Sequence, residues 1–112
     1  MAKRTKFQGL TRVTPAPDLG GGVPWAPSRD GAHVEGVFRG IGRRTGVHGV
    51  FDVVVIDTDT GRVVAGGRRL LDLVRQTRLP PGERIGIVFT GWDDDGARRF
   101  EVHVPTRFAS NG

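Results

Sequence analysis

The chain has 112 residues, enough for one domain and too few for two independent cores. Its formal net charge is +5, and its 17 basic residues are all arginines except Lys3 and Lys6. The absence of cysteine excludes disulfides, thiol catalysis and cysteine-ligated zinc, and no apolar run approaches the roughly 20 residues of a membrane span. We therefore expect a cytoplasmic protein without membrane contact. Its charge suits a polyanion, nucleic acid first, although surplus charge also serves plain solubility.

The first 32 residues are expected to form a largely irregular N-terminal arm, because they are rich in proline and contain three consecutive glycines at 20–22. A short strand could form within this arm at Phe7–Val13. Trp25 stands close to two prolines and is expected to anchor the arm by packing on the core, with stacking on a base as the alternative.

Regularly spaced glycines begin at residue 33 and indicate short strands joined by tight turns. Gly36 and Gly40 interrupt the first strand, and glycines inside a strand mark bulges or sharp coiling. Three strands are predicted in this region, at 33–41, 49–57 and 62–67, separated by a polar, basic loop at 42–48 and a turn at 58–61.

The strand at 49–57 is apolar on both faces, so periodicity does not decide which face is buried. Asp52 favours an outward position for its own face, which predicts that Phe51 lies in the core. The outward Val54 and Ile56 would then be covered by the arm, by nucleic acid or by another subunit.

A single helix is predicted at 68–78. Leu70, Leu71 and Val74 share one side of it at i, i+3, i+4 spacing, while charged residues occupy mostly the other side. Pro80 ends the helix. Two further strands are predicted at 84–91 and 98–104, with a turn at 92–97 and with inward positions at Ile85, Ile87, Phe89, Phe100, Val102 and Val104.

Five strands with one helix between the third and the fourth is the element order of an OB-fold, a small all-β barrel. The sequence therefore predicts an OB barrel at 33–104, followed by a short tail at 105–112. Closure of the barrel would remove exposed strand edges, and the helix would fill its open end. An SH3-like barrel is the main alternative, but it needs no full helix at that point.

A family resemblance covers roughly residues 33–104. It rests on a glycine-broken first strand (VEGVFRGIGRR), a strand pair with a TG corner (GVFDVVVI and TGRVVAGGRRLLDLV), a PGERI-type strand opening (LPPGERIGIVFTGW) and a last strand, RRFEVHV. These segments resemble the phage-type OB-fold single-stranded DNA-binding proteins. The resemblance implies DNA binding in the replication or recombination of a phage or a mobile element, in which case the cytoplasm is that of the host cell.

Nucleic acid on an OB barrel lies across the outer face of the second and third strands, flanked by the loops after the first and fourth strands. Arginines at these places can neutralise phosphates, and an exposed aromatic ring can stack on a base. The candidate binding residues are Arg39, Arg43, Arg44, His48, Arg62, Trp92, Arg98 and Arg99. The alternative is that Arg43 and Arg44 are a solvated loop pair and that Trp92 caps the end of the barrel.

No catalytic or metal-binding pattern is recognised, so we expect no enzyme, no cofactor and no metal. The run Asp93–Asp95 favours a hairpin turn, because three consecutive carboxylates do not converge on one centre. His33, His48 and His103 lack the spacing of metal ligands. The arginines of the helix are expected to be a solvated face outside the binding site.

The leading hypothesis is sequence-tolerant binding of single-stranded DNA, with RNA as the alternative ligand. The second is a structural or protein-interaction module that assembles with itself, as a homo-oligomer, or with a virion or replisome partner. The ligand prediction depends on a sheet that curls shut and on arginine-bearing corners that face one shared groove.

Overall fold

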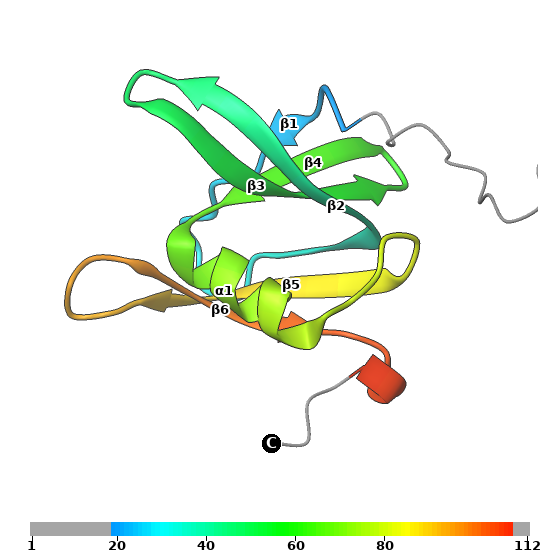
Figure 1. Ribbon diagram of the computed structural model, residues 1–112. Coiled ribbons are helices and arrows are strands. Elements are labelled where there is room, and N and C mark those ends of the chain that lie inside the picture. Colours follow the sequence, from blue (N-terminus) through cyan, green and yellow to red (C-terminus); the bar gives the residue numbers. More distant parts are fainter. Residues whose placement is uncertain (1–18, 109–112) are drawn as a thin grey trace, which may run out of the picture.

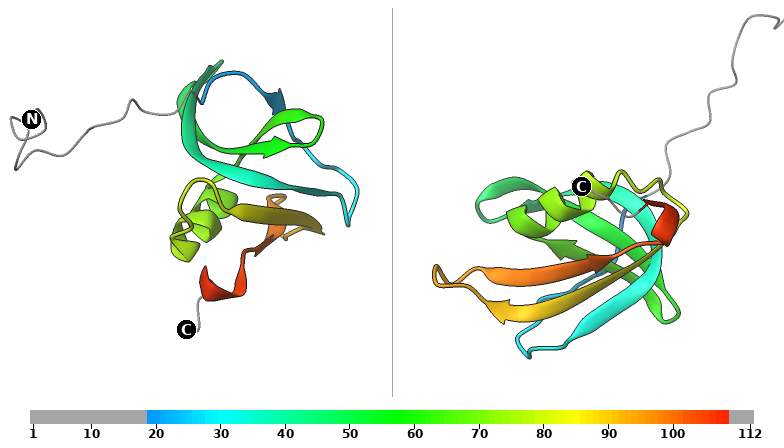
Figure 2. Two further views of the ribbon diagram at one scale, coloured as in Figure 1. Left: turned by 90° about the vertical axis from the view of Figure 1, so that its right-hand side faces the viewer. Right: turned by 90° about the horizontal axis from the view of Figure 1, so that it is seen from below.

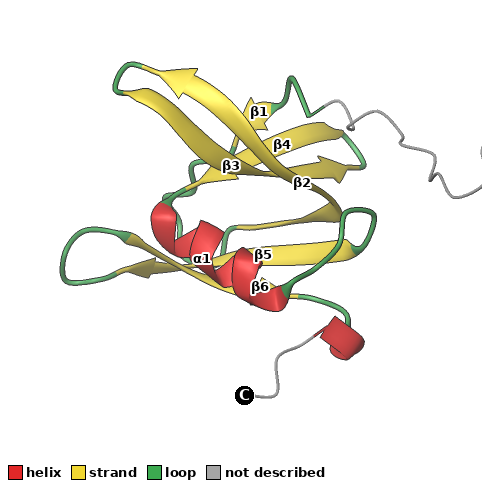
Figure 3. Ribbon diagram, in the orientation of Figure 1, coloured by secondary structure: helices red, strands yellow, loops and turns green. Residues whose placement is uncertain are grey.

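A computed structural model describes residues 19–108, in which six strands form one curled sheet and one α-helix packs against it (Figure 1). The strands are β1 (Val23–Pro24), β2 (His33–Gly46), β3 (Gly49–Thr58), β4 (Gly61–Gly66), β5 (Arg84–Trp92) and β6 (Arg98–His103), in the spatial order β1-β4-β3-β2-β5-β6. The helix is α1 (Arg68–Thr77), and a short 3-10 helix, η2, spans Thr106–Phe108 (Figure 3). The strand considered at Phe7–Val13 lies outside the described residues.

The long strand β2 joins the two halves of the sheet. Residues 33–37 pair with β5 and residues 37–46 pair with β3, both antiparallel. A β-bulge between Phe38 and Gly40 bends the strand near the junction of these two ladders, and Gly40 adopts a φ of 125° that favours glycine. A second bulge interrupts the pairing of β5 with β6. The glycine-marked coiling expected from the sequence is therefore present, and the sheet is strongly curved (Figure 2).

The helix α1 covers the concave side of the sheet. Leu70, Leu71 and Val74 are buried in one cluster with Val54 and Ile56 of β3. The alternating residues of β5 belong to the buried core, and those of β6 pack against it, as expected. The predicted helix and its apolar face are confirmed. Within residues 19–108, no helix has the length and apolar character needed to cross a membrane.

The sheet does not close into a barrel, because no ladder joins β4 to β6 within residues 19–108. The free edge of β4 is instead paired in parallel with the two residues of β1. The Trp25 amide then donates to the carbonyl of Val64 at 2.8 Å, and the Trp25 ring lies 5.9 Å from the ring of Phe100 in β6. The prediction of a β-rich fold with one helix is confirmed, and so is the anchoring role of Trp25. The prediction of a closed five-stranded barrel is wrong, because β4 and β6 are not paired. We call the gap between these two strands the seam, and the N-terminal segment spans it.

The strand β3 is buried on both faces, but with the opposite assignment to the one predicted. Phe51 is 48% exposed, whereas the face of Asp52 turns toward α1, where Arg75 donates to the Asp52 carboxylate at 2.9 Å. The prediction for Phe51 failed because the first residues of β3 extend beyond the core. There Asp52 faces the helix and forms an ion pair with Arg75. The other face is covered by Leu19, which packs on the cluster of Val53, Val55 and Val64.

Candidate nucleic-acid interface

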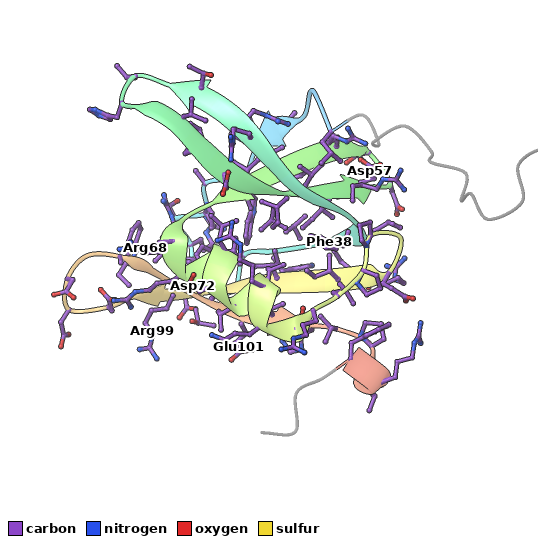
Figure 4. The ribbon with its side chains drawn as sticks, viewed as in Figure 1. Phe38, Asp57, Arg68, Asp72, Arg99 and Glu101 are labelled. Carbon is purple, nitrogen blue, oxygen red and sulfur yellow. The ribbon has the colours of Figure 1, made fainter. Side chains whose placement is uncertain are left out.

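Two β-hairpins extend to the same side of the molecule, on the left in Figure 1 and again when it is seen from below in Figure 2. They hold six of the eight predicted binding residues: Arg43, Arg44 and His48 on the β2–β3 hairpin, and Trp92, Arg98 and Arg99 on the β5–β6 hairpin. The start of α1, marked by Arg68, lies between the two hairpins (Figure 4). The arginine-bearing corners therefore share one side, although the sheet that supports them is open.

The basic segment at 42–48, predicted to be a loop, is mostly strand. Residues 42–46 pair with β3, which leaves a two-residue turn at 47–48. Arg43 and Arg44 are thus neighbours within a strand, and successive side chains of a strand point to opposite faces. The two arginines therefore belong to different surfaces and do not act as a pair.

Arg44 binds the chain's own backbone. Its Nη2 donates to the carbonyl oxygens of Leu19 and Gly21, at 2.8 and 2.6 Å. Arg43, in contrast, is 76% exposed, and its closest acidic partner is Asp52, with 3.5 Å between Nε and Oδ1. Of this pair, Arg43 is the residue that remains accessible to a ligand.

Arg39 and Arg62 share one carboxylate. Arg62 donates to both oxygens of Asp57, at 2.7 and 3.1 Å, and also to the carbonyl of Gly20 at 3.0 Å. Arg39 lies 3.5 Å from the same carboxylate. The hydrogen bonds from Arg62, followed by the charges of Arg62 and Arg39, lower the pKa of Asp57 below its ordinary value, against an opposing effect of desolvation. Arg62 is therefore engaged inside the protein, whereas Arg39 is 38% exposed beside the same carboxylate.

The lowered pKa of Asp57 predicts a specific acid sensitivity. A carboxylate whose pKa is depressed in the folded state stabilises the fold above its unfolded-state pKa and loses that contribution as the pH falls through the folded-state value. We expect the free energy of unfolding to fall between about pH 5 and about pH 2, and to fall less in Asp57→Asn. Denaturant titrations across this range measure the difference, with the exposed turn residue Asp59→Asn as the control. Equal acid sensitivity in both variants would contradict the prediction.

Trp92 and Arg98 form a stacked pair at the end of the β5–β6 hairpin. The Arg98 guanidinium carbon lies 4.8 Å from the centre of the Trp92 ring, and Arg98 Nε donates to the carbonyl of Pro27 at 2.8 Å. The rings of Trp92 and Phe89 meet in a T-shaped contact, yet Trp92 remains 49% exposed. Arg99 follows on the opposite face of β6 and is exposed. Trp92 and Arg99 are therefore the accessible residues of this hairpin, on its two opposite faces.

The acidic run between these residues is a turn, as predicted. Asp93 accepts hydrogen bonds from the amides of Asp95 and Ala97, and the Asp93 amide donates to the carbonyl of Ala97. The amide of Ala97 is the main cause that lowers the pKa of Asp93, and the charges of Arg69 and Arg99 act in the same direction. Arg69 of α1 also forms an ion pair with Asp93. No group of three or more acidic or histidine side chains within residues 19–108 could hold a metal ion.

A groove of about 730 Å³ lies between the β2–β3 hairpin and α1. We call it the helix-side groove, and its lining residues are Val50, Phe51, Asp52, Gly67, Arg68, Leu71, Asp72 and Arg75. It combines aliphatic side chains with two arginines and two carboxylates, and Arg75 is already paired with Asp52, so that Arg68 is its accessible cation. Such a surface can accept an unstacked base beside a phosphate.

Two residues of this groove, Phe51 and Arg68, were not predicted to bind. Arg68 stands in the first turn of α1, which contains no acidic residue and begins at Gly67 without a side-chain cap. Backbone amides at such a helix start favour an anion. Arg68 forms no ion pair with any residue in 19–108. The sequence signal that could have indicated Arg68 is the basic pair Arg68 and Arg69 at the start of the helix. Positive charge is unfavourable at a helix N-terminus, so its presence there is unusual.

Comparisons with known proteins find no matching family model, no matching curated protein and no matching solved structure. The resemblance of residues 33–104 to single-stranded DNA-binding proteins therefore stays a prediction. The case for a function depends on the geometry of the hairpins and of the helix-side groove.

Proposed function

We propose that the protein binds single-stranded DNA without sequence preference, along the side of the molecule that carries both hairpins and the helix-side groove. The observation that carries the proposal is the groove itself, where the cation of Arg68 lies beside the exposed Val50, with the exposed ring of Phe51 on the adjoining face of β3. Sequence-tolerant binding needs this combination of cations for phosphates and aromatic faces for bases.

The accessible residues divide into two roles. Arg43, Arg68 and Arg99 would neutralise phosphates, and Phe51 and Trp92 would stack on bases. Bases within a duplex are already stacked and paired, so aromatic platforms of this kind favour single strands. His48, exposed in the turn of the β2–β3 hairpin, would add a hydrogen-bond donor at one end of this surface.

We also propose that the curled sheet is an open variant of the OB-fold. In this view β2 to β6 are its five strands, and α1 lies between the third and the fourth of them. The order of elements and the strongly bent first strand support this view. The resemblance to phage-type proteins would then extend to a role in replication or recombination.

Removing one accessible arginine from each hairpin tests the binding surface. In the double variant Arg43→Ala/Arg99→Ala we expect weaker binding of labelled oligo-dT. The slope of log affinity against log salt concentration should become shallower by about 1.4, or about 0.7 for each phosphate that is no longer neutralised. Titrations at several salt concentrations measure the slope. If the wild-type protein fails to bind even at low salt, the proposal is wrong.

A matched control removes the same charge elsewhere. Arg84 and Arg107 are exposed and lie toward the opposite end of β5, where they pair with Glu35 and Glu83. The variant Arg84→Ala/Arg107→Ala lowers the net charge by the same two units and should keep the wild-type salt slope. Competition by RNA and by duplex DNA then defines the preferred nucleic acid.

A second candidate function is an interaction module, favoured by the apolar tip of the β2–β3 hairpin. Val47 is 97% exposed, and Val50 and Phe51 are exposed beside it. Contiguous apolar residues of this kind mark interaction surfaces when they form a patch. Light scattering on nuclease-treated protein distinguishes the two candidates, because a stable assembly indifferent to DNA would favour the module.

A further inference from the structure

The outer face of β3 and β4 is covered by residues 19–24, which we call the N-terminal strap, and Trp25 anchors its C-terminal end on Phe100. Leu19 packs on Val53, Val55 and Val64, and the two residues of β1 pair with the edge of β4. This is the face on which the sequence predicted nucleic acid. The strap therefore occupies a surface that adjoins the proposed binding side.

Two of the predicted binding arginines hold the strap. Arg44 donates to the carbonyls of Leu19 and Gly21, and Arg62 donates to the carbonyl of Gly20. The backbone oxygens of three consecutive residues thus lie on two guanidinium groups. Phosphate oxygens of a nucleic-acid strand are also acceptors for arginine, and they carry a full negative charge that strengthens the hydrogen bond.

The strap has the features of a segment that can be displaced. Only Val23 and Pro24 pair with the sheet as a strand. The glycines at 20–22 contribute no side-chain packing, and glycine gains more conformational freedom on release than any other residue. Gly22 is needed for close approach, because a Cβ at this position would lie 3.0 Å from the side chains of both Arg62 and Val64.

We infer that the N-terminal strap competes with single-stranded nucleic acid for the outer face of β3 and β4. The inference rests on the proposed function and adds its regulation. With the strap bound, the ligand contacts the hairpins and the helix-side groove. With the strap displaced, Arg44 binds a phosphate as well, while Arg62 keeps its two hydrogen bonds to Asp57, and the apolar patch under Leu19 becomes a surface for bases.

The variant Leu19→Ser tests the inference, because it weakens the strap and leaves every arginine in place. We expect it to bind oligo-dT severalfold more tightly than the wild-type protein. Its salt slope should be steeper by about 0.7, since Arg44 would neutralise one more phosphate. Val23→Ser is the matched control: Val23 lies in the same strap but is exposed, so this variant should keep the wild-type slope.

A second measurement uses the wild-type protein and does not depend on the folding of a variant. Nuclear Overhauser effects between the methyl groups of Leu19 and Val55 should be present in the free protein and absent at saturating oligo-dT. If the wild-type protein binds, but these effects persist and Leu19→Ser gains neither affinity nor slope, the strap is a fixed part of the fold and the inference is wrong. If neither protein binds at low salt, the proposed function itself is wrong, and the inference with it.

Discussion

Replacing Trp92 by alanine is expected to weaken the binding of oligo-dT by about 5- to 150-fold, or about 1–3 kcal/mol, which is the usual effect of removing one base-stacking platform. The residue is half exposed at the end of β5, and the Arg98 guanidinium on the ring adds positive charge beside the base that would stack there. Fluorescence anisotropy with labelled oligo-dT at one fixed salt concentration measures the loss.

The control for this prediction is Trp92→Phe, which keeps an aromatic face and should retain most of the affinity. Because Trp92 also makes a T-shaped contact with the buried Phe89, thermal unfolding of both variants must show that the fold is intact. A folded Trp92→Ala protein with wild-type affinity would exclude Trp92 from the interface.

The largest effect on stability is expected from Gly36→Ala in β2. A Cβ at this position would lie 2.3 Å from the backbone oxygen of Asp57 and 3.0 Å from Ile56 Cγ2. Backbone atoms of a central strand cannot move aside cheaply, so we expect a loss of about 3 kcal/mol or more, at the upper end of overpacking effects. For a domain of this size, each kcal/mol lowers the melting temperature by about 4–8 °C.

Gly86→Ala is the matched control, since Gly86 also lies in the middle of a strand. A Cβ there would meet only the His103 Cβ at 3.8 Å, an ordinary contact. Thermal unfolding of the two variants should therefore separate them clearly. Similar melting temperatures would contradict the close approach of β2 and β3 at Gly36.

Local patterns in the sequence predicted the strands and the helix well. The β-branched run of β3 and the periodic leucines of α1 are signals that their neighbours along the chain do not disturb. The glycine at 40 correctly indicated a bulge, because its backbone conformation is one that side chains disfavour.

The binding surface was harder to predict, because it depends on the pleat and on distant contacts. Extending β2 by five residues changed Arg43 and Arg44 from a loop pair into residues on opposite faces. The partners of Arg44 and Arg62 in the strap are 25 and 42 residues away, and no local pattern reports such contacts. The arginines of α1 were not included among the predicted binding residues, because no local pattern in the sequence shows that α1 begins between two hairpins.

The seam has a consequence for the order of folding. The residues that span it, 23–27, leave the ribosome early, yet they contact Val64 and Phe100, which are synthesised much later. The Trp25 side chain therefore cannot pack on Phe100 until β6 has been synthesised. A nascent chain that stops short of residue 98 would leave this tryptophan without its aromatic partner, so in a Trp92→Phe variant its fluorescence would report the packing of Trp25 on β6.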